Sequence, residues 1–355
     1  MKIVIVFGAF SFGGTERVAC ELANIFISMQ YDVTIITMKK KELCYQLSEK
    51  VHIYNGLSGN SKLRQISILK KTIETIEPDI VLSFMTQINI ACILALANSK
   101  VPLIISERNS PRDMPRSKTQ RFLRRMLYPF AEGFVFQTNE AKQYFSSSIQ
   151  KRSRVIGNPL FLEADIVPFN KRKNEIVSVG RLMPQKDHIT LLKAFEEFQK
   201  YNKDYKLKIY GDGPERKNLE EYIHIHNLGK HVELYGNSKN VQKDISYSKL
   251  FVLSSRFEGM PNALMEAMGL GLVSISTDCP CGGPRELIEN TINGFLYDVG
   301  DYKGLASILK HVTSEEDLSL IGEKATISMQ RYSIDVIAKE WDSYIINIKG
   351  KYKYG

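Results

Sequence analysis

The sequence predicts an α/β protein made of two doubly wound domains, each built on a parallel β-sheet. The chain has 355 residues, which is the length of about two domains. Apolar, β-branched runs of strand length alternate with segments of helix length along the whole chain. Most of these runs lack polar alternation, as is typical of strands that helices cover on both faces. The same βα repetition occurs twice, so we expect two such sheets.

The first half of the chain contains seven runs that we interpret as strands. The opening run follows Met1 and Lys2 directly, has no small-residue cleavage site and leads into a glycine-containing loop. It therefore indicates a core strand and not a signal peptide. The expected strands are 2–7, 32–37, 51–54, 79–84, 102–106, 133–137 and 154–156, with helices that include 15–29, 63–76 and 87–97.

The second half repeats the scheme with strands expected at 175–179, 206–210, 231–235, 250–254, 272–276 and 294–297. The periodicity is weakest over 158–173, where Pro159 and Pro168 interrupt it, so we expect the linker there. From Ser333 a helical pattern runs to about residue 348. We therefore predict an N-terminal domain over 1–165, a C-terminal domain over 166–332 and a terminal helix over 333–355 that packs back across the junction.

The composition excludes several classes of protein. Hydrophobic residues make up 43% of the chain and charged residues 25%, which excludes disordered, collagen-like and coiled-coil chains. The best apolar run, 88–97, has about half of the ~20 residues that span a bilayer. The five cysteines are odd in number and lie mostly in apolar segments, as expected of reduced, buried thiols. These features predict a soluble cytoplasmic protein.

The positive charge is concentrated in one region. The chain has 48 Lys+Arg against 39 Asp+Glu, a net charge of +9. Residues 1–170 hold 22 basic and 14 acidic side chains, whereas 171–355 hold 26 and 25. Residues 100–154 alone hold 12 basic and 4 acidic side chains. A local basic field of this kind indicates an anionic partner.

Two glycines follow the first predicted strand and open the first helix. Gly13 and Gly14 would let backbone N–H groups approach a phosphate or a sugar at a helix N-terminus. The alternative is a tight strand-to-helix turn without a ligand. The pattern is not the dinucleotide fingerprint, and no acidic residue ends the second strand, which disfavours a dehydrogenase.

Arg181 and Lys186 follow the first strand of the second domain. Ligands of doubly wound sheets bind beyond the carboxyl ends of the strands, so both cations could converge on one point there. Such a pair suits a pyrophosphate that gains charge as its bond to a sugar breaks. The alternative is a surface Arg and Lys that flank a loop.

The segment 254–262 ends another strand and leads into a helix that carries Glu266. We expect Pro261 at the first helical position and Gly259 where backbone approaches a ligand. The N–H groups of a helix start attract anions, and Glu258 adds an acceptor at this place. Glu266 lies eight residues later, near the same helix face. Two such carboxylates could hold hydroxyls of one extended ligand; as isolated acids they would be solvated helix residues.

These motifs together resemble glycosyltransferase family four. The stretch EGMPNALME at 258–266 is similar to the Glu-x7-Glu signature of that family, and 180–187 is similar to its donor-phosphate motif. The glycine loop at 12–16 and the segment NGFL at 293–296 match its remaining patterns in order. The resemblance covers essentially the whole chain. It implies a GT-B fold, with two Rossmann-like domains facing a cleft, and sugar transfer with retention of configuration and without a metal.

The resemblance also implies roles for single residues. Arg181 and Lys186 would stabilise the departing diphosphate, and Glu258 would bind sugar hydroxyls. Glu266 would bind the ribose, and the base would rest near Asn237. The remaining donor contacts would come from Gly13, Gly14, Gly259, Met260, Pro261 and Asn262.

Glu107 marks a departure from the family. Many members carry a His after the fourth or fifth N-terminal strand, where this chain reads ISERN at 105–109. Glu107 would replace that His as a catalytic residue that contacts the donor sugar or the acceptor. The alternative is an ion pair with Arg108 or Arg112. Members with such a stretch resemble enzymes that extend lipid-linked oligosaccharides, including N-acetylgalactosaminyltransferases.

The basic excess peaks in a predicted helix within 116–130. Phe122, Leu123, Met126 and Leu127 form an apolar stripe there, and the cations beside it are Lys118, Arg121, Arg124 and Arg125. A second basic amphipathic piece covers 62–73. Such helices suit an anionic membrane or a lipid-diphosphate acceptor; the alternative is a packed helix with a solvated outer face. Nucleic acid is disfavoured because no stacking aromatics are interleaved with the charge.

We therefore predict a retaining, metal-independent glycosyltransferase. It would transfer a hexose or N-acetylhexosamine from a nucleotide sugar, UDP-linked, to a hydroxyl of a polyprenyl-diphosphate-linked or surface-polysaccharide glycan. We expect it at the inner face of the cell membrane. Two alternatives stay open: an enzyme acting on a soluble sugar or sugar phosphate, in the manner of a sucrose-phosphate synthase or an epimerase, and a non-catalytic nucleotide- or RNA-binding protein.

Overall fold

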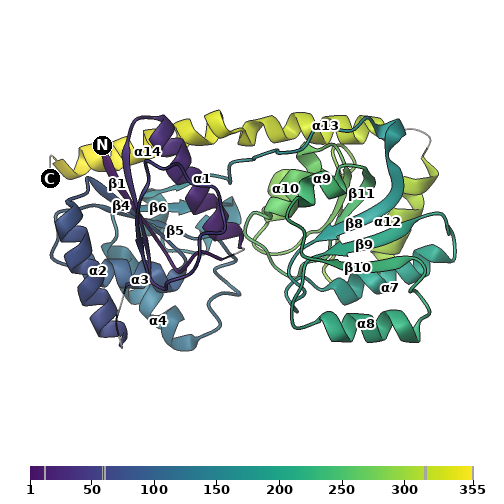
Figure 1. The fold of residues 1–355 in the computed structure, drawn as a ribbon, viewed down its shortest axis with the longest axis horizontal. Coiled ribbons are helices and arrows are strands. Elements are labelled where there is room, and N and C mark those ends of the chain that lie inside the picture. The colour runs from purple at the N-terminus through teal and green to yellow at the C-terminus, as the bar shows by residue number, and fades with distance from the viewer. Residues whose placement is uncertain (12, 58, 60, 316–317, 354–355) are drawn as a thin grey trace. The chain divides into compact units, whose positions relative to one another are not determined.

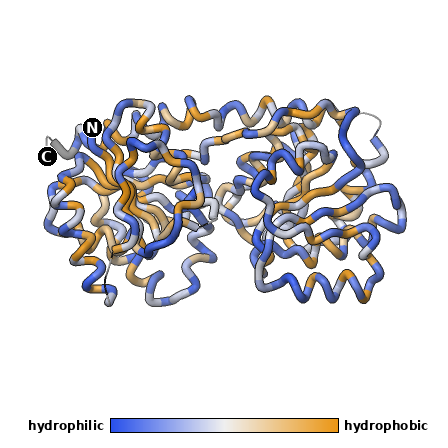
Figure 2. The backbone as a smooth tube through the Cα atoms, in the orientation of Figure 1, coloured by the Kyte–Doolittle hydropathy of each residue, from blue (hydrophilic) through white to orange (hydrophobic). Residues whose placement is uncertain are grey.

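The chain folds into two compact units. A computed structural model describes residues 1–355 except 12, 58, 60, 316–317 and 354–355. Unit 1 combines Met1–Pro159 with the C-terminal segment Ile334–Gly355, and unit 2 is Leu160–Ser333 (Figure 1). In each unit the most hydrophobic residues lie in the central strands, as Figure 2 shows.

Unit 1 contains one sheet of seven parallel strands in the order β3-β2-β1-β4-β5-β6-β7. Strands β1, β4, β5 and β6 are buried almost throughout, which explains their uninterrupted apolar sequences. The order reverses between β1 and β4, and ligands of such sheets bind beyond the strand ends at this point. The strands are β1 (Lys2–Phe7), β2 (Asp32–Thr37), β3 (His52–Asn55), β4 (Ile80–Phe84), β5 (Leu103–Ser106), β6 (Gly133–Phe136) and β7 (Ser153–Val155).

Helices cover both faces of this sheet, with α1 and α14 on one side and α2, α3 and α4 on the other (Figure 1). The terminal helix packs on the sheet through buried aromatic side chains: Trp341 is fully buried, and the Tyr344 hydroxyl accepts the Phe134 N–H at 2.8 Å. The helices are α1 (Gly14–Ser28), α2 (Lys62–Ile76), α3 (Thr86–Leu96), α4 (Lys118–Leu127), α5 (Asn139–Gln143), α6 (Ser147–Lys151) and α14 (Ile334–Lys353), and the 3-10 turn η1 is Tyr128–Phe130.

Unit 2 contains six parallel strands in the order β10-β9-β8-β11-β12-β13. They are β8 (Lys173–Val179), β9 (Lys206–Tyr210), β10 (Val232–Gly236), β11 (Ser248–Leu253), β12 (Val273–Thr277) and β13 (Phe295–Tyr297). The helices are α7 (His188–Gln199), α8 (Arg216–Ile225), α9 (Val241–Ile245), α10 (Asn262–Gly269), α11 (Gly283–Leu287), α12 (Tyr302–Ser314) and α13 (Ser319–Met329), with the 3-10 turns η2 (Phe169–Lys171) and η3 (Gln330–Tyr332).

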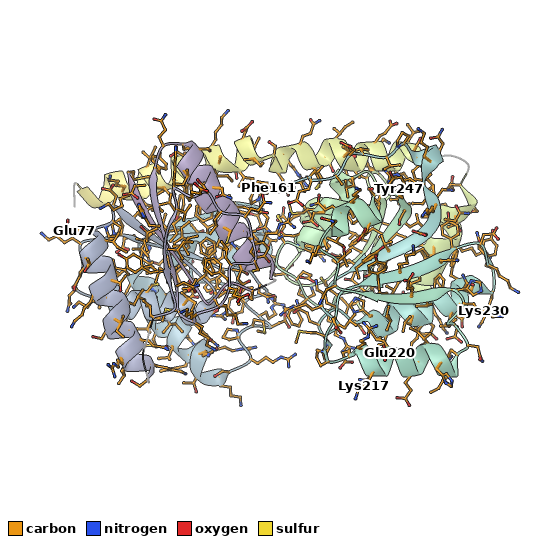
Figure 3. The ribbon with its side chains drawn as sticks, viewed as in Figure 1. Glu77, Phe161, Lys217, Glu220, Lys230 and Tyr247 are labelled. Atoms are coloured by element: carbon orange, nitrogen blue, oxygen red, sulfur yellow. The ribbon has the colours of Figure 1, made fainter. Side chains whose placement is uncertain are left out.

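Helix α8 of unit 2 is amphipathic. On α8, Leu219 is 2% exposed and belongs to the core, whereas Lys217 and Glu220 point outward (Figure 3). Among the described residues, no helix combines the length and the apolar composition that crossing a membrane requires.

The segment expected as a linker is tied to unit 2 from residue 160 onward. The Leu160 N–H donates to the Tyr332 carbonyl at 2.8 Å. The Arg172 guanidinium, 7% exposed, donates to the carbonyls of Leu270 and Gly271 at 2.6 and 2.8 Å. Burial lowers the pKa of Arg172 to about 10. The carbonyl oxygens replace the water molecules that would otherwise hydrogen-bond to the guanidinium.

The predicted strands all overlap observed ones, with bounds that differ by at most two residues. The agreement arises because strands buried on both faces need apolar residues at every position, and such runs are visible without knowledge of their neighbours.

Candidate functional site

The best-defined polar cluster of unit 2 joins Lys186, Glu258 and Ser255. Lys186 Nζ lies 2.6 Å from Glu258 Oε1, and Ser255 Oγ donates to the same oxygen at 2.6 Å. The Lys186 and Glu258 side chains are only 17% and 10% exposed, so the pair is held away from bulk water. The two charges come from loops 72 residues apart in the sequence. The fold therefore brings together two of the predicted catalytic residues.

Three loops at the carboxyl ends of β8, β11 and β12 build this cluster. The Ser254 hydroxyl donates to the Lys186 carbonyl at 2.8 Å, which joins the first loop to the second. The Glu258 N–H donates to the Pro280 carbonyl at 2.7 Å, and the Cys281 N–H donates back to the Glu258 carbonyl at 3.0 Å. Paired backbone bonds thus fix the peptide that carries the Glu258 carboxylate.

Gly283 lets the second and third loops approach one another. A Cβ atom at Gly283 would lie 1.6 Å from the Gly259 carbonyl oxygen, far inside van der Waals contact. Only a residue without a side chain permits this approach. Gly259 itself carries the backbone that follows Glu258, so the position of Gly283 determines the shape of the predicted donor loop.

Helix α10 begins one residue later than predicted. Pro261 occupies the N-cap position, with φ −78° and ψ 108°, and not the first helical position. Its ring supplies no side-chain acceptor for the first N–H groups of the helix. Glu258 lies in the loop before the helix, so the expectation that Glu258 and Glu266 share a helix face is wrong. Both are nevertheless buried, at 8% and 6% exposed.

Arg181 and Asn237 do not join the Lys186–Glu258 pair. Arg181 is exposed on the loop after β8 and makes no hydrogen bond or ion pair with either member within the described chain. Asn237 is exposed just beyond β10. The adjacent Tyr210 and Tyr235 rings have centroids 4.6 Å apart, and the Gly211 N–H donates to the Gly236 carbonyl at 2.7 Å. Tyr210, Gly211, Tyr235 and Gly236 thus form a second group, at the carboxyl ends of β9 and β10.

His188 begins α7 directly after the Lys186 loop. It is 4% exposed, and its Nδ1 has no hydrogen-bond partner among the described residues. Burial, and then the nearby Lys186 charge, lower the pKa of His188 to about 3. The imidazole is therefore neutral at physiological pH and adds no positive charge to the site.

In unit 1 a tyrosine holds the glycine loop. The Gly13 N–H donates to the Tyr45 hydroxyl at 2.9 Å, and that hydroxyl donates to the Gly13 carbonyl at 3.0 Å. Gly13 is the N-cap of α1 and Gly14 is its first residue. Phe12, part of the predicted motif, lies outside the described residues. The loop is thus a helix start whose backbone is fixed by Tyr45.

Glu107 is the centre of a buried network in unit 1. It is 4% exposed and accepts hydrogen bonds from the Tyr128 hydroxyl, the Thr86 hydroxyl (3.1 Å) and the Asn89 amide (3.4 Å). The ion pair with Arg108 or Arg112 that the sequence left open does not form within the described chain. Arg108 instead donates to Asn158 at 2.7 Å.

Two family models together match residues 12–326 of the chain. The model described as "Glycosyltransferase Family 4" matches residues 12–163, and the model described as "Glycosyl transferases group 1" matches residues 162–326. The chain belongs to glycosyltransferase family 4.

Individual glycosyltransferases resemble the chain over nearly its full length. The GalNAc-α-(1→4)-GalNAc-α-(1→3)-diNAcBac-PP-undecaprenol α-1,4-N-acetyl-D-galactosaminyltransferase of Campylobacter jejuni is 29% identical, covering 98% of this chain and 99% of the relative. The amylovoran biosynthesis glycosyltransferase AmsD of Erwinia amylovora is 27% identical, covering 97% and 99%. The predicted glycosyltransferase fits these relatives better than the two alternative functions do.

Solved structures confirm the predicted GT-B fold class. Anabaena HepE in complex with UDP and glucose superimposes with a TM-score of 0.80 at 19% identity, covering 97% of this chain and 98% of HepE. At this identity the likeness concerns the fold. It agrees with the two parallel sheets and their covering helices.

Sequence reasoning missed several residues of this candidate site. Ser255 bonds to Glu258, and Pro280 and Gly283 shape the loop around it. Pro280 acts through its backbone carbonyl and Gly283 through its missing side chain. Neither contribution leaves a chemical signature in a single sequence. Ser255, three residues before Glu258, was a usable signal, because a hydroxyl at this spacing can reach the carboxylate.

Helix α4 buries one of the four cations that were expected on its surface. Lys118, Arg121 and Arg125 lie at or near the surface, but Arg124 is 3% exposed and is not part of a charged surface. Its guanidinium donates to the Pro111 and Met114 carbonyls at 2.7 and 2.9 Å. The assignment of Arg124 to a membrane or acceptor surface is therefore wrong, because loop carbonyls draw its charge inward.

Removing the Glu107 carboxyl is expected to destabilise unit 1. Glu107→Leu would leave the buried Tyr128 and Thr86 hydroxyls without this acceptor, at about 1–3 kcal/mol each, whereas the Asn89 amide keeps the Tyr128 oxygen at 2.9 Å. We expect the free energy of unfolding to fall by about 3 kcal/mol or more, and Glu107→Gln, which keeps an acceptor oxygen, to lose less. Denaturant titration measures both. Equal losses in the two variants would contradict the network.

The same network predicts a pH dependence. Burial raises the pKa of Glu107 above its ordinary 4.5, and the hydrogen bonds from Tyr128, Thr86 and Asn89 oppose the shift. A raised pKa in the folded state means that folding favours the protonated Glu107 carboxyl. This contribution to the free energy of unfolding is fully present below pH 4.5 and is lost as the pH rises through the pKa of the folded state. The wild type should therefore lose stability relative to Glu107→Gln as the pH rises above 4.5. Denaturant titrations at several pH values measure this difference, and a constant difference would contradict the shift.

Proposed function

We propose that the chain transfers a hexose or N-acetylhexosamine from a UDP-sugar to a hydroxyl of a polyprenyl-diphosphate-linked glycan, with retention of configuration and without a metal. The observation that carries the proposal is the buried Lys186–Glu258–Ser255 cluster at the carboxyl ends of the unit 2 strands. A relative whose name specifies a PP-undecaprenol-linked glycan, and a fold relative bound to UDP and glucose, support the acceptor and donor classes.

The cluster suggests how the donor is handled. The Lys186 ammonium pairs with the Glu258 carboxylate at 2.6 Å. A donor diphosphate would compete for Lys186, which would release Glu258 to accept hydrogen bonds from sugar hydroxyls. As the bond between the anomeric carbon and the phosphate oxygen breaks, Lys186 and the exposed Arg181 would stabilise the charge that develops on the leaving diphosphate. The acceptor oxygen then bonds to the anomeric carbon, and its proton passes to the diphosphate.

The remaining donor contacts are assigned to the same loops. The N-terminus of α10 favours negative charge, so the backbone of Gly259, Met260, Pro261 and Asn262 would face the phosphates or the sugar. Glu266 would bind the ribose, and the base would rest near Asn237. We thus propose unit 2 as the donor-binding domain.

Unit 1 is proposed as the acceptor-binding domain, working at the inner face of the cell membrane. Gly13 and Gly14 would approach the donor phosphates or sugar. Lys118, Arg121 and Arg125 would attract the anionic lipid-linked acceptor. For Glu107, burial favours a positioning role, in which it holds Thr86 at the start of α3, over direct contact with the sugar.

A transfer assay tests the proposed function. Purified protein is incubated with a panel of UDP-sugars and an undecaprenyl-diphosphate-linked glycan in the presence of EDTA, and the product is analysed by mass spectrometry and proton NMR. We expect the mass of the glycan to increase by one hexose or N-acetylhexosamine in an α linkage. Absence of transfer with every donor, or transfer to free sugar phosphate only, would contradict the proposal.

A further inference from the structure

Three arginine side chains are buried in the described part of the chain, and one of them differs from the others in its partners. Arg124 donates to two loop carbonyls, and Arg172 donates to carbonyls through Nε and both Nη atoms. Arg108, 7% exposed, donates from Nη1 to Asn158 Oδ1 at 2.7 Å. Its Nε and Nη2 have no hydrogen-bond partner among the described residues. Arg108 is thus a buried cation with unsatisfied N–H groups.

No carboxylate neutralises Arg108 within the described residues. The preceding Glu107 turns toward α3 and η1, where it accepts hydrogen bonds from Thr86 and Tyr128. Arg108 turns toward Trp341 of α14, on the other face of the sheet (Figure 1). Burial alone shifts the pKa of Arg108, from 12.5 to about 9, so the guanidinium stays charged at neutral pH. A buried charge without a counter-charge is costly, so an anion that reaches Arg108 would stabilise the folded protein.

The two unpartnered nitrogens of Arg108 form one edge of its guanidinium. The Nε–H and one Nη2–H point in the same direction, and such an edge binds two oxygens of a carboxylate or phosphate side by side. Arg108 Cζ lies over the Phe84 and Trp341 rings, 5.2 and 5.7 Å from their centroids. These cation–π contacts stabilise the charge but supply no acceptor oxygen. The Nε–Nη2 edge therefore has the geometry of an oxyanion site and lacks the oxyanion.

Two further buried polar atoms on this face have no hydrogen-bond partner in the part of the chain that the structure describes. They are Ser106 Oγ and Trp341 Nε1. Ser106 ends β5 and pairs in register with Phe84 of β4, and the Phe84 ring packs on the Trp341 ring. An indole N–H only donates, and a hydroxyl can donate. We call Ser106, Arg108 and Trp341 the Arg108 cluster. It lies at the carboxyl ends of β4 and β5, where ligands of doubly wound sheets bind.

We propose that the Arg108 cluster binds an oxyanion, a phosphate or carboxylate group, side-on to Arg108 Nε and Nη2, with Ser106 and Trp341 as further donors. A water molecule would offer one oxygen and no negative charge, so it would leave the guanidinium uncompensated. A free anion from solution and an anionic group of a substrate would offer the same two oxygens. The inference does not rest on the proposed function, because it concerns the donors of unit 1 alone.

Thermal unfolding of the full chain in inorganic phosphate tests the site. Sodium phosphate replaces sodium chloride stepwise at pH 7 and constant ionic strength. An anion that binds the folded state raises the melting temperature as its concentration increases. We expect a rise of about 3 °C or more in the wild type, and a loss of most of this rise in Arg108→Met. Arg108→Lys keeps the charge but not the two-pronged edge, so it should keep less than about half of the rise.

Arg172→Met is the matched control, because it removes an equally buried guanidinium that carbonyls already satisfy. It should lower the melting temperature in both salts and keep the wild-type response to phosphate. An equal response in the wild type, Arg108→Met and Arg108→Lys would be a general salt effect and would overturn the proposal. Arg108→Met is expected to fold, since it replaces an unpaired buried charge by an apolar side chain. Should it not fold, Arg108→Lys against the wild type decides.

Turnover measurements identify the source of the oxyanion. If phosphate raises KM for the UDP-sugar or for the glycan acceptor by a larger factor in the wild type than in Arg108→Met, the oxyanion belongs to that substrate. If phosphate stabilises the wild type through Arg108 without such a difference in either KM, the site holds a free anion. Both results support the site. The unfolding experiment needs no sugar transfer, so failure of the proposed function would leave its outcome interpretable.

Discussion

Lys186→Ala is expected to lower kcat for sugar transfer by about 10²–10³-fold, as removal of one preorganised electrostatic group does in other active sites. The substitution removes the ammonium that lies 2.6 Å from Glu258 and that would stabilise the departing diphosphate. The Glu258 carboxylate would then keep the hydrogen bond from the Ser255 hydroxyl but lose its ion pair. Steady-state turnover of a UDP-sugar measures the effect.

Unit 2 supplies a matched control for this experiment. Lys208 Nζ lies 2.8 Å from Glu175 Oε1, with side chains 22% and 12% exposed, and Ser248 Oγ donates to Glu175 at 3.1 Å. This second Lys–Glu–Ser cluster lies at the beginnings of β8 and β11, away from their carboxyl ends. Lys208→Ala should change stability to a similar degree and leave kcat unchanged. If the kcat values of the two variants agree within about threefold, Lys186 has no role in the chemical step.

Gly283→Ala is expected to reduce kcat/KM for the UDP-sugar by about 100-fold, because displacements near 1 Å in an active site have effects of this size. The new methyl group would lie 1.6 Å from the Gly259 carbonyl, so the loop that carries Glu258 and Gly259 must move. We also expect the free energy of unfolding to fall by about 1–3 kcal/mol from overpacking.

Gly229→Ala is the control for this loop. A Cβ atom at Gly229 would meet no heavy atom within 4 Å, so this variant should keep wild-type kinetics and stability. Thermal melting establishes that the Gly283→Ala protein is folded at the assay temperature. Wild-type kcat/KM in folded Gly283→Ala would mean that the backbone at Gly259 is not part of the donor site.

Much of the fold was predictable because parallel strands that are buried on both faces have uninterrupted apolar sequences. Strands such as β1 and β4 need apolar residues on both faces, and these runs stand out without any knowledge of tertiary contacts. The strand-end motifs also identified Lys186 and Glu258 as separate candidates. Their contact was not predictable, since it depends on how loops 72 residues apart meet.

The errors have a common physical cause. Periodicity gives the faces of a helix but not which face is buried, and for α4 the answer lay in the irregular loop whose carbonyls bind Arg124. The position of Pro261 similarly depended on the local backbone of the loop before α10. Backbone carbonyls are identical in every residue, so a sequence does not reveal which of them will face a side chain.

Titration calorimetry with UDP and with uridine, both in the presence of EDTA, tests the central claim most directly. The claim is that the strand-end loops of unit 2 bind a nucleotide diphosphate through Lys186 and the start of α10. Two charge-assisted hydrogen bonds to the diphosphate predict that UDP binds at least about 100-fold more tightly than uridine, and that Lys186→Ala removes most of this difference. Equal affinities for UDP and uridine, or no detectable UDP binding by the wild type, would contradict the claim.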